Sequence, residues 1–351
     1  MASFPQSSTS PAEEPITSPS HLDRISYLYG HPLRNSLSPL LHKTIFDTLG
    51  LNWAQIPLSV SSSSSPSSSS YSYTRSPPIQ TFLAHIRSDP KFIGASVTMP
   101  WKVSITSHLD SLTEDAQRVG ACNTIFIREE KGRRVFMGTN TDCVGIREAL
   151  LQNAPGGGVG YYCDKPALII GGGGTARAAV YALRRWLRCS HIYVVNRDRA
   201  EVEALMAEDR ERSLLSKDEH KAELIPVTEP AQVAALKPPA AIVSGIPNYP
   251  PKTSEEINTR RVIEAFLNHP SEKKGAILEM CYHPAPWTEI AELAANSGWK
   301  VVLGTEAMIW QGLEQSRLWT GRDVVQVPGL VQRVKDAISA AVAERARAEK
   351  P

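Results

Sequence analysis

The stretch Ile169-Ile170-Gly171-Gly172-Gly173-Gly174-Thr175-Ala176-Arg177 decides the fold, because an apolar strand runs directly into glycines and then into an alanine-rich helix. The first glycine of such a loop permits a tight turn, the second lets the backbone approach a pyrophosphate, and a third small residue lets helix and strand pack closely. The N–H groups at the start of the helix then face the anion. The stretch therefore predicts dinucleotide binding. The expected contacts are Gly171 and Gly173, with Ala176 as the third small residue.

Strand and helix signals alternate regularly around this loop. Helical stretches, such as 176–187 and 200–207, supply the crossovers that a parallel sheet needs. The pattern predicts an α/β fold in which residues 146–310 form a Rossmann domain with a doubly wound parallel sheet. The polar segment 208–222 is expected to be a surface extension. The expected strands are 167–170, 192–195, 223–226, 240–244, 276–280 and 300–303.

The second of these strands ends at Val195-Asn196-Arg197-Asp198, where an adenosine ribose is expected. A carboxylate at this place accepts hydrogen bonds from both ribose hydroxyls and repels a 2′-phosphate, whereas an arginine pairs with that phosphate. Because both types are present, NAD and NADP remain open. Asp198 favours NAD.

A mixed α/β unit precedes the glycine loop and is predicted to form the substrate-binding domain. It covers residues 24–145 and is completed by a C-terminal helix in 311–351, whose apolar positions lie on one face. Residues 1–23 are expected to be a disordered tail. Residues 59–78 are expected to be a serine-rich surface insertion, since eleven of the fourteen residues from 59 to 72 are serine. Strands are expected at 24–29, 52–58 and 94–98 and in a hairpin of 121–127 with 134–138, and helices at 39–49, 81–87 and 113–119.

Composition excludes several partners. With 38 basic and 36 acidic residues the net charge is +2, which gives no sequence-wide basic field for nucleic acid. No stretch approaches the roughly 20 apolar residues of a membrane span. The five cysteines form no C-x-x-C pair, so we expect neither disulfides nor a metal site, and a cytoplasmic protein. A monomer and a homodimer both remain possible.

Three segments before the glycine loop set polar groups in apolar surroundings. They are Asn35-Ser36-Leu37-Ser38-Pro39 before a helix, Val97-Thr98-Met99-Pro100-Trp101-Lys102 after a strand, and Asn140-Thr141-Asp142. Ser36 and Ser38 alternate about Leu37, so both hydroxyls can point to one side of an extended turn. Each segment alone reads as a cap or a surface residue. Together they indicate a site.

With these segments in place the sequence resembles the shikimate/quinate dehydrogenase family. The resemblance covers about Tyr27 to Gly321, in the family's order, and its end is similar to the stand-alone fungal branch. The matching motifs are YGHPLRNSLSPLLHKTIF, GASVTMPWK, GACNTIF, GTNTDCVG, IIGGGGTARAAV, VVNR and GTEAMIWQG.

The resemblance implies a role for each matching residue. Lys102 and Asp142 match the catalytic pair, and Ser36 and Ser38 match the hydroxyls that hold the substrate carboxylate. The groups that match the binding of the ring hydroxyls are Thr98, Asn123 and Gln311, with Tyr282 as an aromatic hydroxyl lining the site. The residues that match the cofactor contacts are Gly171, Gly173, Gly174, Thr175 and Ala176 in the loop, together with Asn196, Arg197, Asp198, Met280 and Gly304.

The chemistry of these residues agrees with the implied activity. Oxidising a secondary alcohol needs a base for the hydroxyl proton as hydride leaves the carbon, which Lys102 can provide with Asp142 orienting it. Two departures bear on the substrate and the cofactor: Ser96 stands where the family has Asn, and Asp198 stands where it has Thr. We expect reversible NAD(P)-linked oxidation of quinate or shikimate, a cyclic polyhydroxy acid. The rival is a non-catalytic sensor of these acids on the same fold.

Overall fold

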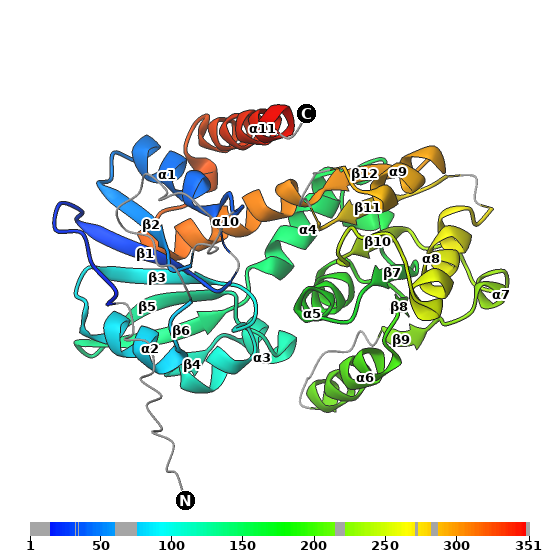
Figure 1. The fold of residues 1–351 in the computed structure, drawn as a ribbon, viewed down its shortest axis with the longest axis horizontal. Coiled ribbons are helices and arrows are strands. Elements are labelled where there is room, and N and C mark those ends of the chain that lie inside the picture. The colour runs from blue at the N-terminus through cyan, green and yellow to red at the C-terminus, as the bar shows by residue number, and fades with distance from the viewer. Residues whose placement is uncertain are drawn as a thin grey trace, which may run out of the picture.

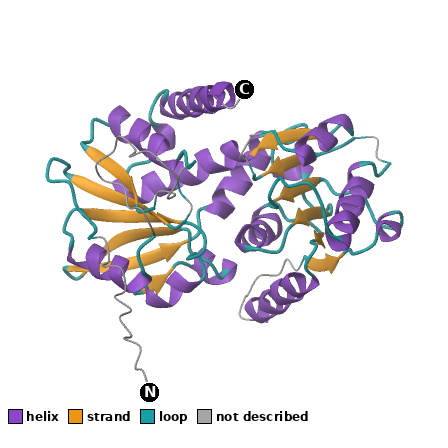
Figure 2. Ribbon diagram, in the orientation of Figure 1, coloured by secondary structure: helices purple, strands orange, loops and turns teal. Residues whose placement is uncertain are grey.

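The computed structural model describes residues 15–31, 33, 35–59, 76–214, 222–270, 273–281 and 287–348. Its strands form two separate six-stranded sheets, each covered by helices on both faces (Figure 1 and Figure 2). The two-part α/β architecture is therefore as the sequence predicts.

The first sheet is mixed and has the order β2-β1-β3-β5-β6-β4. β1 pairs in parallel with β2 and β3, whereas β5 pairs antiparallel with β3 and β6. The predicted hairpin turns at Lys131 and Gly132, which both have positive φ, as a two-residue hairpin loop requires. Its strands are β1 (Arg24–Tyr29), β2 (Trp53–Pro57), β3 (Phe92–Val97), β4 (Ser111–Leu112), β5 (Thr124–Glu130) and β6 (Arg133–Thr139), and its helices are α1 (Ser38–Thr48), α2 (Ile79–Ser88) and α3 (Glu114–Val119).

The second sheet is parallel throughout and has the order β12-β11-β10-β7-β8-β9. The chain winds outward in one direction from β7 and in the other from β10, so the strand order reverses between these two neighbours. In such sheets ligands bind at the carboxyl ends of the strands beside the reversal. The strands are β7 (Ala167–Ile170), β8 (His191–Val195), β9 (Glu223–Pro226), β10 (Ala241–Ser244), β11 (Ala276–Glu279) and β12 (Lys300–Leu303), and the helices are α5 (Gly174–Tyr181), α6 (Arg199–Leu214), α7 (Pro230–Val233), α8 (Ser254–Leu267) and α9 (Glu289–Asn296).

Two helices, α4 (Asp142–Gln152) and α10 (Gly304–Thr320), pack on each other between the sheets (Figure 1). They approach so closely at Gly145 that a Cβ there would lie 2.3 Å from the Ala307 carbonyl oxygen. The expected boundaries at 145 and 311 fall inside these shared helices. The division into domains at those residues stays a prediction.

The C-terminal segment is two helices, not the single helix expected over 311–351. α10 ends at Gly321, whose positive φ is the left-handed conformation typical of a helix end. A 3₁₀ turn, Val324–Gln326, and Pro328 separate it from α11 (Leu330–Ala348). α11 packs against α1, as the apolar face of this segment predicts (Figure 1).

Part of the expected disordered tail is packed, so that expectation is wrong for residues 15–23. Leu22 is buried, and Ser18 Oγ donates to Asp89 Oδ2 at 2.5 Å. Lys91 Nζ donates to the carbonyl of Pro19 at 3.1 Å. These contacts hold a segment whose composition alone favours disorder. Residues 1–14 lie outside the described residues.

The serine-rich insertion is packed at both of its edges. Ser59 is buried, with its Oγ 2.6 Å from His31 Nδ1. At the other edge Ser76 Oγ accepts from Trp101 Nε1 at 2.8 Å, and the Pro77 carbonyl accepts from Tyr29. The expected surface insertion is therefore shorter than 59–78. Residues 60–75 lie outside the described residues.

The expected surface extension 208–222 begins as helix, because α6 continues to Leu214. Glu208 accepts two hydrogen bonds from Arg177, at 2.9 and 2.8 Å, and one from Arg212 at 2.7 Å. These bonds lower the pKa of Glu208 to about 2 and tie α6 to α5. Residues 215–221 lie outside the described residues.

Among the described residues, no helix combines the length and apolar character needed to cross a bilayer. The same residues contain no group of three or more His, Cys, Asp or Glu placed to hold a metal ion.

Candidate active site

Lys102 and Asp142, which lie 40 residues apart, form an ion pair between the two sheets. Lys102 Nζ donates to Asp142 Oδ2 at 2.5 Å, and the two side chains are 20% and 15% exposed. Asp142 is the first residue of α4, and its N–H donates to Asn140 Oδ1. The Lys102 carbonyl accepts from the Cys122 N–H at 2.7 Å, which anchors the loop that carries the lysine. Backbone contacts thus fix both members.

Asn123 holds the second oxygen of the Asp142 carboxylate. Its Nδ2 donates to Asp142 Oδ1 at 2.8 Å and lies 3.4 Å from Gln311 Oε1, while its Oδ1 accepts the Thr141 N–H at 2.6 Å. Thr141 Oγ1 donates to Gln311 Oε1 at 3.1 Å. The structure therefore brings Asn123, Gln311 and the Lys102–Asp142 pair together, as expected.

Thr98 enters this region at the end of β3. Its N–H donates to the Tyr29 carbonyl, and a Cβ on Gly30 would lie 2.4 Å from Thr98 Cγ2. Gly30 has φ of 147°, so this close approach depends on glycine. Tyr282, the remaining expected substrate residue, lies outside the described residues.

The two expected carboxylate-binding serines have different partners. Ser36 Oγ accepts the Ser38 N–H at 3.2 Å. Ser38, only 6% exposed, donates its hydroxyl proton to Gln55 Oε1 at 2.7 Å. Gln55 Nε2 in turn donates to Ser96 Oγ at 2.9 Å, and Ser96 Oγ donates to Gln315 Oε1 at 2.8 Å. Ser96, which departs from the family's Asn, is thus part of a buried network.

Sequence reasoning missed Gln55, Gln315 and His42. Gln315 lies one helical turn after Gln311 on α10, so the i, i+4 spacing could have found it. His42 is buried between α1 and α10, with Nε2 3.1 Å from Gln315 Oε1 and Nδ1 2.9 Å from Ser316 Oγ. Burial lowers the pKa of His42 to about 3, so its ring is neutral near pH 7.

The glycine loop fits a pyrophosphate. Gly171 has φ of 123°, and a Cβ on Gly173 would meet nothing within 4 Å, so space lies open beside the loop. α5 begins without a side-chain cap and without an acidic residue in its first turn. Its first N–H groups can therefore bind an anion. A Cβ on Gly174 would lie 4.0 Å from Lys102 Cδ, which places the lysine beside this loop.

The end of β8 carries both charges that the sequence shows, but each has a partner. Arg197 pairs with Glu256 at the start of α8. Asp198 Oδ1 accepts the Ala200 N–H at 2.8 Å and so caps α6. Asn196 Nδ2 donates to Glu201 Oε2 at 2.7 Å. The carboxylates of Asp198, Glu201 and Glu256 therefore lie at this edge together with the paired Arg197 and with Arg199, the first residue of α6.

Met280 and Gly304 meet where β11 and β12 end. A Cβ on Gly304 would lie 2.4 Å from the Met280 carbonyl oxygen, so only glycine lets α10 begin here. Glu279 and Ser244 are paired neighbours on β11 and β10. Both are buried, and Glu279 Oε2 and Ser244 Oγ make no hydrogen bond among the described residues. Burial raises the pKa of Glu279 to about 7.

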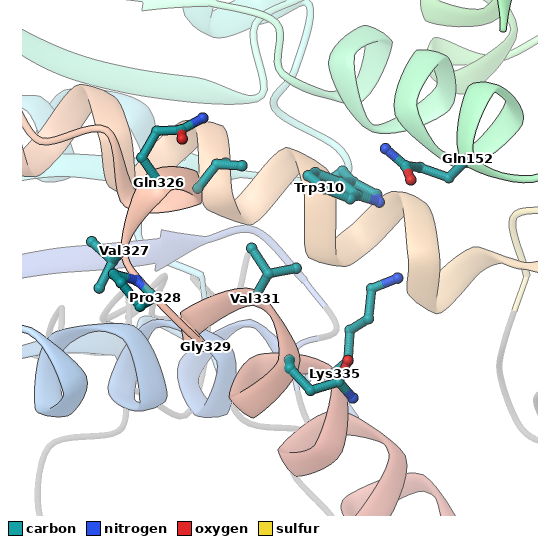
Figure 3. Close-up of a pocket in the computed structure, with 10 residues that line it drawn as sticks. Gln152, Trp310, Gln326, Val327, Pro328, Gly329, Val331 and Lys335 are labelled. Atoms are coloured by element: carbon teal, nitrogen blue, oxygen red, sulfur yellow. The ribbon is translucent and has the colours of Figure 1, made fainter.

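A separate pocket of about 440 Å³ lies between α4, α10 and α11 and contains none of the expected site residues (Figure 3). Trp310 lines it with Gln152 and Lys335, and the lysine Nζ lies 5.7 Å from the indole centroid. Trp310 directly precedes Gln311 on α10, yet Trp310 lines this pocket whereas Gln311 contacts Thr141 in the candidate active site. The pocket is not the site described above.

The glycine loop, the parallel sheet and the adjacent Lys102–Asp142 pair define the class as a two-part α/β oxidoreductase. Residues 28–125 match the family model described as the shikimate dehydrogenase substrate binding domain. The chain is 57% identical to quinate dehydrogenase of Emericella nidulans over 337 residues, 95% of this chain and 99% of the relative.

Solved structures agree. The shikimate 5-dehydrogenase of Thermus thermophilus, in complex with NADP(H) and shikimate, is 26% identical with a TM-score of 0.62, over 90% of this chain and 99% of that one. The quinate dehydrogenase of Corynebacterium glutamicum, in complex with NAD, is 20% identical with a TM-score of 0.66, over 90% and 99%, and shows the shared fold. The chain belongs to the shikimate and quinate dehydrogenase family and is a dehydrogenase.

Proposed function

We propose that this enzyme catalyses the reversible, NAD(P)-linked oxidation of quinate to 3-dehydroquinate, or of shikimate to 3-dehydroshikimate. One observation carries the proposal: Lys102, paired with Asp142, lies beside the glycine loop, with its Cδ 4.0 Å from the position of a Cβ on Gly174. This geometry supports a role for Lys102 as a base beside a bound nicotinamide dinucleotide. The polar groups around the pair suit a substrate rich in hydroxyls.

Each side of the site has a proposed role. Ser36 and Ser38 hold the substrate's carboxyl end, and Thr98, Asn123 and Gln311 bind its ring hydroxyls, with Tyr282 as the aromatic hydroxyl. The glycine loop and the start of α5 hold the pyrophosphate. The proposed cofactor contacts are Gly171, Gly173, Gly174, Thr175 and Ala176 in the loop, Asn196, Arg197 and Asp198 after β8, and Met280 and Gly304 beside the nicotinamide.

The cofactor and the protein would supply different parts of the reaction. The cofactor, when bound, supplies the hydride acceptor. Lys102 Nζ, after releasing a proton to solvent, takes the proton of the substrate hydroxyl with its lone pair. Asp142 orients the neutral amine and pairs with the ammonium group that forms. Asn123, bonded to the second carboxylate oxygen, prevents Asp142 from turning away. A base of this kind contributes about 10²–10⁴ in rate.

NAD is the proposed cofactor, in preference to NADP. Arg197, the group that would pair with a 2′-phosphate, is already paired with Glu256. Asp198 and Glu201 add carboxylates to the same edge, and these repel a phosphate. The adenosine ribose of NAD carries no 2′-phosphate, so these carboxylates do not repel it.

A cytoplasmic location and a small assembly, monomer or homodimer, complete the proposal. The five cysteines all lie within the described residues and none of them forms a disulfide bond, which agrees with a reducing compartment.

The first experiment follows the absorbance of the reduced nicotinamide with quinate and with shikimate, each against NAD and NADP. We expect turnover with at least one acid and a higher kcat/KM with NAD. No reduction in any of the four combinations would overturn the catalytic function and favour the sensor.

The second experiment uses Lys102→Ala. We expect turnover to fall by about 10²–10⁴ while calorimetric binding of the acid largely survives, because the lysine acts mainly on the transferring proton. Activity equal to that of the unchanged enzyme would contradict the role of Lys102.

A further inference from the structure

A chain of hydrogen bonds crosses the buried side of the first sheet and connects a carboxylate-binding serine with the catalytic pair. From Ser38 it reaches Gln315 through Gln55 and Ser96, as described above. Gln315 Nε2 then donates to Thr124 Oγ1 at 2.9 Å, Thr124 Oγ1 donates to Asn123 Oδ1 at 2.8 Å, and Asn123 Nδ2 donates to Asp142 Oδ1. This polar chain consists of Ser38, Gln55, Ser96, Gln315, Thr124, Asn123 and Asp142.

Every bond of the polar chain donates in the same direction, toward Asp142. The direction is set at that end, because an ionised carboxylate only accepts and a backbone N–H only donates. Asn123 must therefore turn its amide nitrogen to Asp142 and its oxygen to the Thr141 N–H. A reversed chain would set the Asn123 oxygen against the carboxylate, with two acceptors facing each other.

The Gln315 and Gln55 amides keep the same direction, because each accepts a hydrogen bond at its oxygen and donates one from its nitrogen. His42 supports it at Gln315, because the neutral ring donates from Nε2 to the oxygen that also accepts from Ser96. Bonds aligned in this way polarise one another in a low-dielectric interior. The orientation of Gln55 is therefore a consequence of the charge on Asp142.

At the Ser38 end of the polar chain, Ser36 and Ser38 differ in what they can offer a substrate. A serine has one proton to donate, and Ser38 gives it to Gln55. Ser38 therefore offers only lone pairs to a substrate. Ser36 Oγ accepts the Ser38 N–H, and its own proton has no acceptor among the described residues, so it can bind a carboxylate. One serine is a donor and the other an acceptor.

We infer that Gln55 is a specificity-determining residue, which holds Ser38 as an acceptor for a hydroxyl on the carbon that bears the substrate carboxylate. Quinate has a hydroxyl on that carbon, whereas shikimate has a ring double bond there and lacks it. Ser36 binds the carboxylate, and Ser38 binds the neighbouring hydroxyl. The inference rests on the proposed function and selects the 1-hydroxy cyclohexane acid as the better substrate.

The test in the unchanged enzyme compares quinate with 1-deoxyquinate, the saturated acid without that hydroxyl. We expect 1-deoxyquinate to bind about tenfold more weakly, since Ser38 would be left without a donor. Calorimetry without cofactor measures this binding apart from catalysis. Equal affinity for the two acids would overturn the inference.

The variant Gln55→Leu removes the acceptor and frees the Ser38 proton. We expect the ratio of kcat/KM for quinate over shikimate to fall about tenfold, with binding of quinate weakened and binding of shikimate kept or improved. Gln55→Glu should restore the ratio when the new side chain is protonated, because it again accepts from Ser38 and donates to Ser96. An unchanged ratio in a folded Gln55→Leu enzyme would refute the inference.

A matched control is Gln117→Leu, which removes an amide of equal size from the exposed face of α3, outside the polar chain. Its ratio should equal that of the unchanged enzyme, and an equal fall in both variants would show an effect unrelated to Ser38. If the unchanged enzyme oxidises neither acid, the proposed function fails. If it oxidises both and only the ratio fails to respond, the inference alone fails.

Discussion

Two polar regions of this molecule are both buried, but they differ in how many of their polar atoms form hydrogen bonds. In the first sheet Ser96 is 6% exposed, and its hydroxyl both accepts and donates a hydrogen bond. In the second sheet Ser244 is fully buried, and its hydroxyl makes no hydrogen bond among the described residues. Its paired neighbour Glu279 has one bonded and one unbonded oxygen.

The difference shows which buried polar groups are fixed by hydrogen bonds and which can change their protonation state. A satisfied buried network holds its members in one geometry, since breaking any bond leaves a group without water or partner. Burial raises the pKa of Glu279 to about 7, because the hydrogen bonds that its carboxylate accepts do not offset the loss of water. The polar network of the first sheet is therefore held in one arrangement, whereas Glu279 at the carboxyl edge of the second sheet is expected to titrate near neutral pH.

The largest expected effect comes from breaking the satisfied region at Gln315. Gln315→Leu removes the acceptor of the Ser96 hydroxyl and of His42 Nε2, and it removes the donor to Thr124 Oγ1. Three buried groups each lose one hydrogen bond, so we expect the free energy of unfolding to fall by about 3 to 5 kcal/mol. Urea unfolding measures the change. Gln332→Leu, an exposed amide on α11, is the control and should change stability by less than about 0.5 kcal/mol. Equal effects of the two variants would remove the distinction between the regions.

The next effect is the pH dependence of stability that Glu279 causes in the second sheet. Between the ordinary pKa of a glutamate, 4.5, and the raised pKa of about 7, the folded chain keeps a proton that the unfolded chain has released. Stability therefore falls as pH rises through this window, by roughly 3 kcal/mol in total. Glu279→Gln should remove that loss.

Thermal unfolding of both proteins from about pH 5 to about pH 8 tests this expectation. His42 acts in the opposite sense, because its pKa is lowered to about 3 and acid favours the unfolded chain, but it is common to both proteins. The difference between the two proteins should therefore isolate Glu279. Parallel pH profiles would show that Glu279 does not titrate in this window.

The smallest effects come from a matched pair of serines. Ser96→Ala should cost about 1–3 kcal/mol, because the Gln55 amide loses its acceptor and the Gln315 oxygen keeps only the His42 donor. Ser244→Ala removes a hydroxyl that only weakly stabilises the charged form of its neighbour Glu279, so we expect it to cost less than Ser96→Ala, about 1 kcal/mol at most. Denaturant midpoints measured side by side compare them. A larger loss at Ser244 would reverse the comparison.

Local signals were enough for the second sheet and its loop. The expected strands at 167–170, 223–226 and 300–303 coincide with β7, β9 and β12, because short apolar runs between helices have few alternatives. The resemblance also named Lys102, Asn123 and Asp142, which the structure brings together. Their catalytic and binding roles stay predictions.

The rest depended on contacts between distant residues. Ser18 is polar and lies in a tail-like segment, yet its partner Asp89 follows 71 residues later. Gln55 looks like an ordinary strand residue until Ser38 and Ser96 are placed on either side of it. Composition favours disorder for the first and gives no signal for the second, since neither bond is visible in local sequence. Such contacts need the fold.

The place of α10 in the chain gives the molecule an order of assembly during synthesis. The bond from Ser96 to Gln315 spans 219 residues, so a ribosome takes roughly 10–40 s to supply the partner of a hydroxyl already made. All six strands of the second sheet precede α10 and can pair before it emerges. The half that begins the chain is therefore the last to be finished, and until α10 emerges Ser96, Thr124 and His42 lack the hydrogen bonds that Gln315 supplies.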